Sequence, residues 1–205
     1  MNTFLKITLA VGCAMLLSAT FFTAALAQSQ SANKDKQAKI RSAMSAAPIA
    51  IAEKATIMDW PAEEGAQMTL LREGTNGYTC LPDMPATSGN DPMCLDEPWM
   101  KWADAWMNKG PVNINKIGFG YMLQGGSVES NTDPYAKGPT EDNEWLTDAV
   151  PHLMIIVPDP AMLEGLPVTP KEAGGGPWVM WRGTEYVQIM APMPRYQPPG
   201  MSMNQ

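Results

Sequence analysis

The hydrophobic positions between residues 96 and 110 repeat at the spacing of an α-helix. At about 100° per residue, one wide arc of this segment is apolar and the opposite arc is polar. The apolar arc carries Trp99, Met100, Trp102, Ala103, Trp106 and Met107. Asp96 precedes the segment as a predicted N-cap, and Gly110 followed by Pro111 is a typical stop signal. We therefore expect one amphipathic helix whose tryptophan face packs onto the rest of the protein.

Four later segments carry patterns typical of β-strands. Residues 117–123 alternate large side chains with glycines, which leaves one face bare for a bulky neighbour, either a packed tryptophan or a ligand. Residues 151–158 are apolar on both faces, as in a central strand. Residues 178–181 and 185–190 predict a hairpin.

The first half of the chain is predicted to add a helix and a second hairpin. Residues 34–47 are good helix formers, and residues 28–33 before them predict a flexible polar tether. Residues 67–72 and 78–80 flank a turn cluster with an Asn-Gly pair, which favours a β-hairpin.

Two irregular segments interrupt these elements. The residues between Cys80 and Cys94 are rich in proline and turn formers, and residues 124–148 are polar and acidic. Long irregular segments inside a domain are either functional or mobile. We predict a single α+β domain over residues 34–193, in which a mostly antiparallel sheet packs against the tryptophan-striped helix, followed by a frayed tail over 194–205.

The chain begins with the pattern of an export signal. A positive charge precedes an apolar run, and Ala25-Leu-Ala27 fits signal-peptidase cleavage, so residues 1–27 predict a signal peptide. We expect a bacterial periplasmic or extracellular protein that is not inserted in the membrane after cleavage. Cys80 and Cys94 should form a disulfide in that oxidising compartment, which would contribute roughly 3 kcal/mol by closing their loop. Buried free thiols or metal thiolates are the alternative.

The net charge of −7 argues against nucleic acid as a partner, because phosphate backbones attract basic surfaces. No Cys-x-x-Cys-His haem motif and no glycine-rich nucleotide fingerprint occurs in the sequence.

Copper(I) is the metal that the composition favours. The chain has one histidine and 17 methionines, and imidazole and thioether sulfur are ligands suited to Cu(I). His152 and Met154 stand two apart on a predicted strand and so share a face, with Met190 and Met193 near the end of another strand. Met201 and Met203 could add a loose second site. The alternative is that these side chains are core residues.

Two further kinds of site are alternative hypotheses. Trp145 in the acidic segment and Tyr121 on the glycine-spaced strand could form a platform for an aromatic or carbohydrate ligand. Ser127 could pair with His152 as a nucleophile, although it lacks the Gly-x-Ser-x-Gly context. A hydrolase could instead use paired carboxylates from the acidic segment, and the candidates there are Asp133, Glu141, Asp142 and Glu144.

Four stretches carry a resemblance to other sequences. They are residues 77–82, 91–94, 121–127 and 176–181. Through them the chain resembles a group of uncharacterised exported bacterial proteins. The resemblance implies a bacterial, exported, one-domain protein, and it implies no activity.

The function that these features favour is a non-catalytic binding or interaction protein, with an unidentified small ligand or protein as its partner. A periplasmic copper-binding protein is the first alternative, and a hydrolase that uses the loop carboxylates is the second.

Overall fold

The computed structural model describes residues 28–63, 65–147 and 150–197. The chain divides into two units, residues 1–38 and 39–205. In the first unit, residues 28–38 are helical, including 28–33, where a flexible tether is predicted. The predicted signal peptide and the tail methionines lie outside the described residues.

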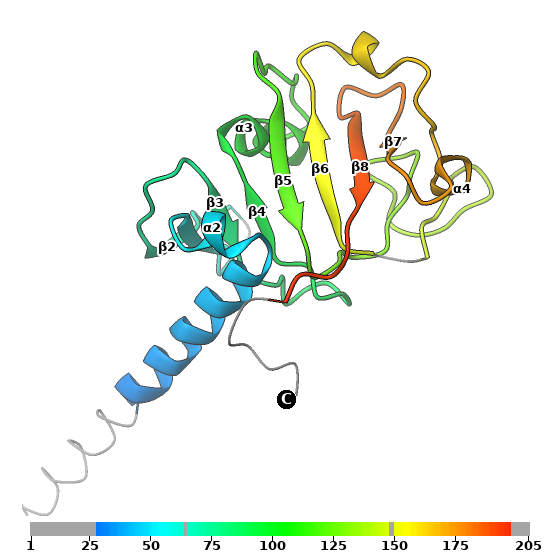
Figure 1. Cartoon of the computed structure of the whole chain (residues 1–205). Helices are drawn as coiled ribbons and strands as arrows, with labels where there is room; N and C mark the ends of the chain where they lie inside the picture. The colour runs from blue at the N-terminus through cyan, green and yellow to red at the C-terminus, as the bar shows by residue number, and fades with distance from the viewer. Residues whose placement is uncertain (1–27, 64, 148–149, 198–205) are drawn as a thin grey trace, which may run out of the picture. The chain divides into compact units, whose positions relative to one another are not determined.

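Within the described part of the second unit, eight strands form one sheet in the order β2-β1-β3-β4-β5-β6-β8-β7 (Figure 1). The strands are β1 (Thr56–Asp59), β2 (Thr69–Arg72), β3 (Thr79–Leu81), β4 (Met93–Leu95), β5 (Gly118–Met122), β6 (His152–Ile156), β7 (Trp178–Met180) and β8 (Gln188–Pro192). All neighbours pair antiparallel except β1 and β3. The predicted α+β fold is confirmed, with β6 inside the sheet and β7–β8 as a hairpin.

The hairpin predicted for residues 67–72 and 78–80 is wrong, because β1 lies between these two segments. β2 pairs with β1 on one side, and β3 pairs with β1 in parallel on the other. The Asn-Gly turn instead contacts the segment before β1. Asn76 donates a side-chain hydrogen bond to the carbonyl of Ile51, and the backbone N–H of Thr75 donates one to the carbonyl of Lys54. The turn is therefore packed on residues 51–54, which lead into β1, and β1 lies beside β3.

Cys80 and Cys94 form the predicted disulfide. They are directly opposite each other in β3 and β4, and both are fully buried. Their side chains lie in an apolar cluster together with small residues of the mostly helical segment before β1, among them Ala43, Ala46 and Ala52. The disulfide therefore closes the loop 82–92, which we call the disulfide loop.

Helix α3 (Glu97–Met107) packs on one face of the sheet, as predicted. The side chain of Asp96 caps the helix by accepting a hydrogen bond from the backbone N–H of Trp99, and it also accepts one from Phe119 on β5. A Cβ on Gly120 would lie 3.3 Å from the Trp99 ring, so the bare face of β5 receives a tryptophan. The other short helices are α2 (Ile49–Ala52), α4 (Pro170–Ala173) and the 3₁₀ helix Pro160–Leu163.

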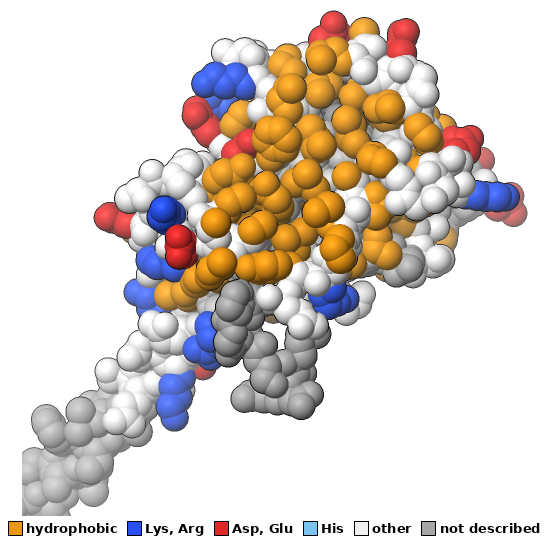
Figure 2. All heavy atoms as spheres, viewed as in Figure 1, with side chains coloured by type: hydrophobic (Ala, Val, Ile, Leu, Met, Phe, Trp, Pro, Cys, Tyr) orange, Lys and Arg blue, Asp and Glu red, His pale blue; other side chains and the backbone are white. Residues whose placement is uncertain are grey.

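The opposite face of β5, β6 and β8 carries apolar side chains that are only partly buried. Leu153, Ile155 and Ile189 belong to this set, and Phe119 is 36% exposed. Figure 2 shows hydrophobic atoms gathered over these strands. None of the described helices has the length and apolar character that crossing a bilayer requires.

Candidate functional site

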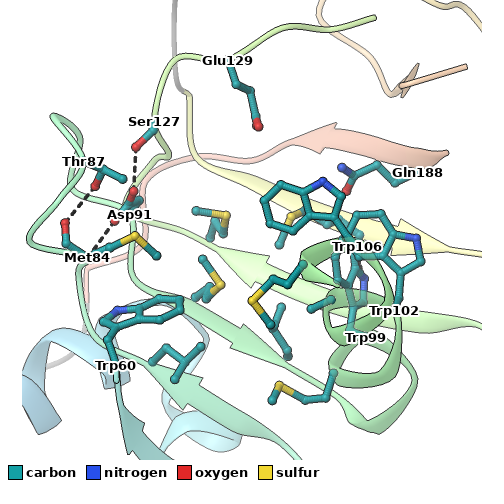
Figure 3. Close-up of a pocket in the computed structure, with 18 of the residues that line it drawn as sticks. Trp60, Met84, Thr87, Asp91, Trp99, Trp102, Trp106, Ser127, Glu129 and Gln188 are labelled. Atoms are coloured by element: carbon teal, nitrogen blue, oxygen red, sulfur yellow. Dashed lines mark hydrogen bonds between the residues drawn. The ribbon is translucent and has the colours of Figure 1, made fainter. Parts of the chain in front are cut away.

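A pocket of about 290 Å³ lies between α3 and the sheet, under the disulfide loop and the start of the long acidic segment (Figure 3). We call it the aromatic pocket. Five of its lining residues are tryptophans, namely Trp60, Trp99, Trp102, Trp106 and Trp181. Seven are methionines, namely Met68, Met84, Met93, Met100, Met107, Met122 and Met154. The helix predicted from hydrophobic spacing therefore supplies one wall of the pocket.

Trp181 joins the acidic segment to the helix. Its ring is parallel to that of Trp102 within 2°, with centroids 5.9 Å apart, and lies 5.7 Å from that of Trp106. Its φ of 55° is in the left-handed region, which is uncommon for a residue other than glycine. The indole Nε1–H donates to the carbonyl of Ser130 at 2.7 Å, and the backbone N–H donates to Asn131 at 2.8 Å. These bonds offset the strain and hold the ring against α3.

The methionines give the pocket an adaptable wall. Their thioether chains are flexible and polarizable, and they make favourable contacts with aromatic rings. Met122 and Met154 extend from β5 and β6, whereas Met84 extends from the disulfide loop. A wall built in this way can adjust to ligands of different outline.

Two loops meet at the rim of the pocket. The hydroxyl of Ser127 donates a hydrogen bond of 2.6 Å to the carboxylate of Asp91. Next to this bond, the backbones of Gly89 and Gly126 are so close that a Cβ on Gly89 would lie 2.3 Å from the carbonyl oxygen of Gly126. The disulfide loop and the acidic segment are therefore joined at this point.

Asp91 is a buried carboxylate with several donors around it. Burial raises its pKa, but hydrogen bonds from the Ser127 hydroxyl and from the backbone N–H of Met84 outweigh burial, so the net pKa is lowered. Asp91 is therefore ionised near neutral pH.

Glu129 extends from the acidic segment into the pocket (Figure 3). Burial of its carboxyl group raises its pKa to about 7, and the negative charge of Asp91 adds to the increase. Among the described residues, no side chain or backbone group donates a hydrogen bond to this carboxylate or forms an ion pair with it. Glu129 is thus an unpaired acid that changes protonation near neutral pH.

Two more polar groups of the pocket lack partners within the described residues. They are the Oε1 atom of Gln188, whose side chain is 3% exposed, and the indole Nε1–H of Trp102. A buried acceptor or donor without a partner costs about 1–3 kcal/mol. Such groups in a pocket wall are available to a bound molecule.

Three of the four residues predicted to bind copper lie on the same face of the sheet. His152, Met154 and Met190 lie on the face of the sheet that α3 covers, with Met154 opposite Met190. The register places Met122, which was not a predicted ligand, opposite His152. The Nδ1 atom of His152 lies 2.7 Å from the carbonyl of Val150, and burial lowers the pKa of this histidine.

Met193 is apart from this group. It follows the end of β8 at an odd spacing from Met190, and it is 41% exposed.

The predicted platform residues lie on different parts of the fold. Tyr121 packs against the disulfide cluster and Tyr78, whereas Trp145 forms an isolated bridge with Ser130 in the acidic segment.

The four predicted loop carboxylates lie at or near the surface. None of them is among the described residues that line the aromatic pocket. Glu144 accepts a hydrogen bond from Asn131, and Asp133 accepts one from the backbone of Tyr135, so both stabilise the loop. Ser127 donates to Asp91, while the described hydrogen bond of His152 goes to Val150.

Three polar residues of the pocket were missed by sequence reasoning. Asp91, Glu129 and Gln188 come from the disulfide loop, the acidic segment and β8. No spacing or motif links them, because they meet only after the sheet has formed. The one available signal was the two-residue spacing of Ser127 and Glu129, which would place both side chains on the same face of an extended segment.

No family model, curated protein or solved structure matches the chain. The resemblance to exported bacterial proteins therefore stays a prediction.

Proposed function

We propose that the protein is a non-catalytic binding protein of the bacterial periplasm or extracellular space, and that the aromatic pocket takes up a small, mostly apolar ligand. The pocket itself carries the proposal. A concave site with apolar and aromatic walls and a few convergent polar groups is the usual form of a small-molecule site. The disulfide supports export, because such bonds persist in oxidising compartments.

The size of the pocket limits the ligand. A volume of about 290 Å³ corresponds to about ten atoms other than hydrogen, at roughly 30 Å³ for a water-sized group. Indole is a neutral, largely apolar probe of this size. We expect saturable binding of indole to the full mature chain in isothermal titration calorimetry.

A matched pair of variants tests the location. Met100→Trp adds volume to the pocket wall and should abolish indole binding, whereas Met162→Trp introduces the same side chain at a position that is 63% exposed and should leave binding unchanged. Ala103→Leu is a milder filling variant that serves if Met100→Trp does not fold. Absence of indole binding to the wild type, or equal binding by a folded filling variant, would contradict the proposal.

Copper(I) binding is a second candidate function, which the strand register favours. Met122 faces His152 and Met154 faces Met190 across neighbouring strands, so soft ligand atoms are gathered on one face. Titration with Cu(I) in the presence of ascorbate should then show one bound ion per chain. His152→Ala should abolish this uptake and Met162→Ala should retain it. No uptake by the wild type would end this hypothesis.

A further inference from the structure

The described wall of the aromatic pocket carries acidic side chains and no basic side chain that could neutralise them. Glu129 and Asp91 both line the pocket, and the described lining includes no lysine, arginine or histidine. The remaining described side chains of the lining are apolar, aromatic or neutral polar groups, and the nearest further titratable group is another acid, Asp83, which accepts a hydrogen bond from the backbone of Asp91. A positive charge in this pocket would therefore have to come from the ligand.

The unpaired polar atoms of the pocket are mostly acceptors. Asp91 is occupied by Ser127 and the backbone of Met84, but the Glu129 carboxylate and Gln188 Oε1 have no donor among the described residues. An ammonium group carries three donors and no acceptor, so its hydrogen-bonding pattern complements these two groups. A hydroxyl group can donate only once, and a carboxylate cannot donate at all when it is ionised.

The aromatic walls are also suited to a cation. The face of an indole ring attracts a positive charge within about 6 Å, and tryptophan is the strongest of the aromatic side chains in this respect. The rings of Trp102, Trp106 and Trp181 are stacked on one another and line the same pocket as Glu129 and Gln188. Figure 3 shows Trp102 and Trp106 near Gln188. The same rings would bury the apolar part of the ligand.

We propose that the natural ligand of the aromatic pocket is an aryl or alkyl amine, bound as its ammonium ion between the Glu129 carboxylate and the tryptophan rings. This inference rests on the proposed function and specifies its ligand class. The ammonium group donates to Glu129 and Gln188, and the hydrocarbon part contacts the tryptophans and methionines.

Binding of such a ligand is linked to protonation. The carboxyl group of Glu129 has a pKa of about 7, so at neutral pH a fraction of the molecules carries a protonated Glu129. These molecules must release that proton before the ammonium ion can pair with the carboxylate. Affinity should therefore increase from pH 5.5 to pH 8, and binding near pH 7 should release protons into the buffer.

Three probes of nearly equal size test the proposal by isothermal titration calorimetry. They are 2-phenylethylamine, 2-phenylethanol and phenylacetate. We expect the amine to bind at least about tenfold more tightly than the alcohol at pH 8, because a charge-assisted hydrogen bond contributes more than a neutral one. Phenylacetate should bind most weakly.

Matched variants locate the effect. Glu129→Gln should remove the preference for the amine and the pH dependence, and it should keep binding of the alcohol and of indole. Glu141→Gln makes the same change at an exposed position of the same segment and should behave as the wild type. A variant that loses indole binding as well is replaced by Glu129→Met, which keeps an apolar wall of similar length.

The outcomes separate the two proposals. If indole and the alcohol bind but the amine has no advantage, or if phenylacetate is preferred, the ammonium proposal is overturned and the proposed function stands. If an amine preference persists in Glu129→Gln, the assignment to Glu129 is overturned. If neither indole nor any of the three probes binds, the proposed function fails.

Discussion

The Ser127 hydroxyl donates a hydrogen bond of 2.6 Å to the Asp91 carboxylate, across 36 positions of the chain. Asp91 belongs to the loop that the disulfide closes, and Ser127 opens the segment that carries Glu129. This bond therefore joins the disulfide loop to the segment that carries Glu129, at the rim of the aromatic pocket.

Removal of this hydrogen bond should weaken the protein at neutral pH and make its stability less sensitive to acid. Ser127→Ala leaves a buried carboxylate with one donor fewer, which should cost about 1–3 kcal/mol of unfolding free energy. Since the folded-state pKa of Asp91 is lowered, its contribution to stability is present above the ordinary pKa and is lost as the pH falls. Ser127→Ala should therefore reduce this loss. Urea titrations from pH 3 to 7 measure both effects.

Ser88→Ala is the control for that experiment, because Ser88 is exposed in the same loop. Its stability should stay within about 0.5 kcal/mol of the wild type. An equal loss in both variants would mean that the bond to Asp91 contributes nothing specific.

Replacement of Glu129 should change how stability depends on pH. The folded-state pKa of about 7 is above the ordinary value of 4.5, so the folded protein retains its proton to higher pH than the unfolded chain. Unfolding free energy should fall by about 2 kcal/mol as the pH rises from 5 to 8, less than the full shift would give because the side chain is partly solvated. Glu129→Gln should remove this slope in denaturant titrations, and Glu141→Gln should keep it.

A side chain at Gly89 should force the two loops apart. In Gly89→Ala the new methyl group meets the carbonyl oxygen of Gly126, a backbone atom that cannot rotate away. We expect a loss of about 1–3 kcal/mol of stability and weaker indole binding. Gly138→Ala is the matched control, since a Cβ there meets nothing within 4 Å. Unaltered thermal unfolding and indole affinity in Gly89→Ala would show that the contact does not position the rim.

Loss of the disulfide should lower stability by about 3 kcal/mol, because the unfolded chain regains the freedom of the loop between Cys80 and Cys94. The double variant Cys80→Ala/Cys94→Ala should have a lower denaturation midpoint than the oxidised wild type. Dithiothreitol should lower the midpoint of the wild type and leave that of the double variant unchanged. A wild-type midpoint that does not respond to full reduction, verified by thiol titration, would contradict this role.

The correct predictions were those that depend on neighbours along the chain. Helix α3 followed from the spacing of Trp99, Trp102 and Trp106, and the cap at Asp96 followed from residue type and position. The disulfide followed from two cysteines close in sequence. The predicted hairpin of residues 67–72 and 78–80 was wrong because a turn signal does not exclude a third strand between the two segments. β1, with the fully buried Ile57, takes that position in the sheet.

The sequence by itself determined helix α3, strand β6, the β7–β8 hairpin and the covalent link, since periodicity, caps and loop closure are local properties. Only the tertiary structure decided the site. Asp91, Glu129, Trp181 and Gln188 meet through contacts between distant segments, and the pKa of Glu129 depends on burial and on a charge that is 38 positions away in the sequence. Such through-space effects have no signature in residue spacing, because the field at a carboxyl group depends on which atoms surround it after folding.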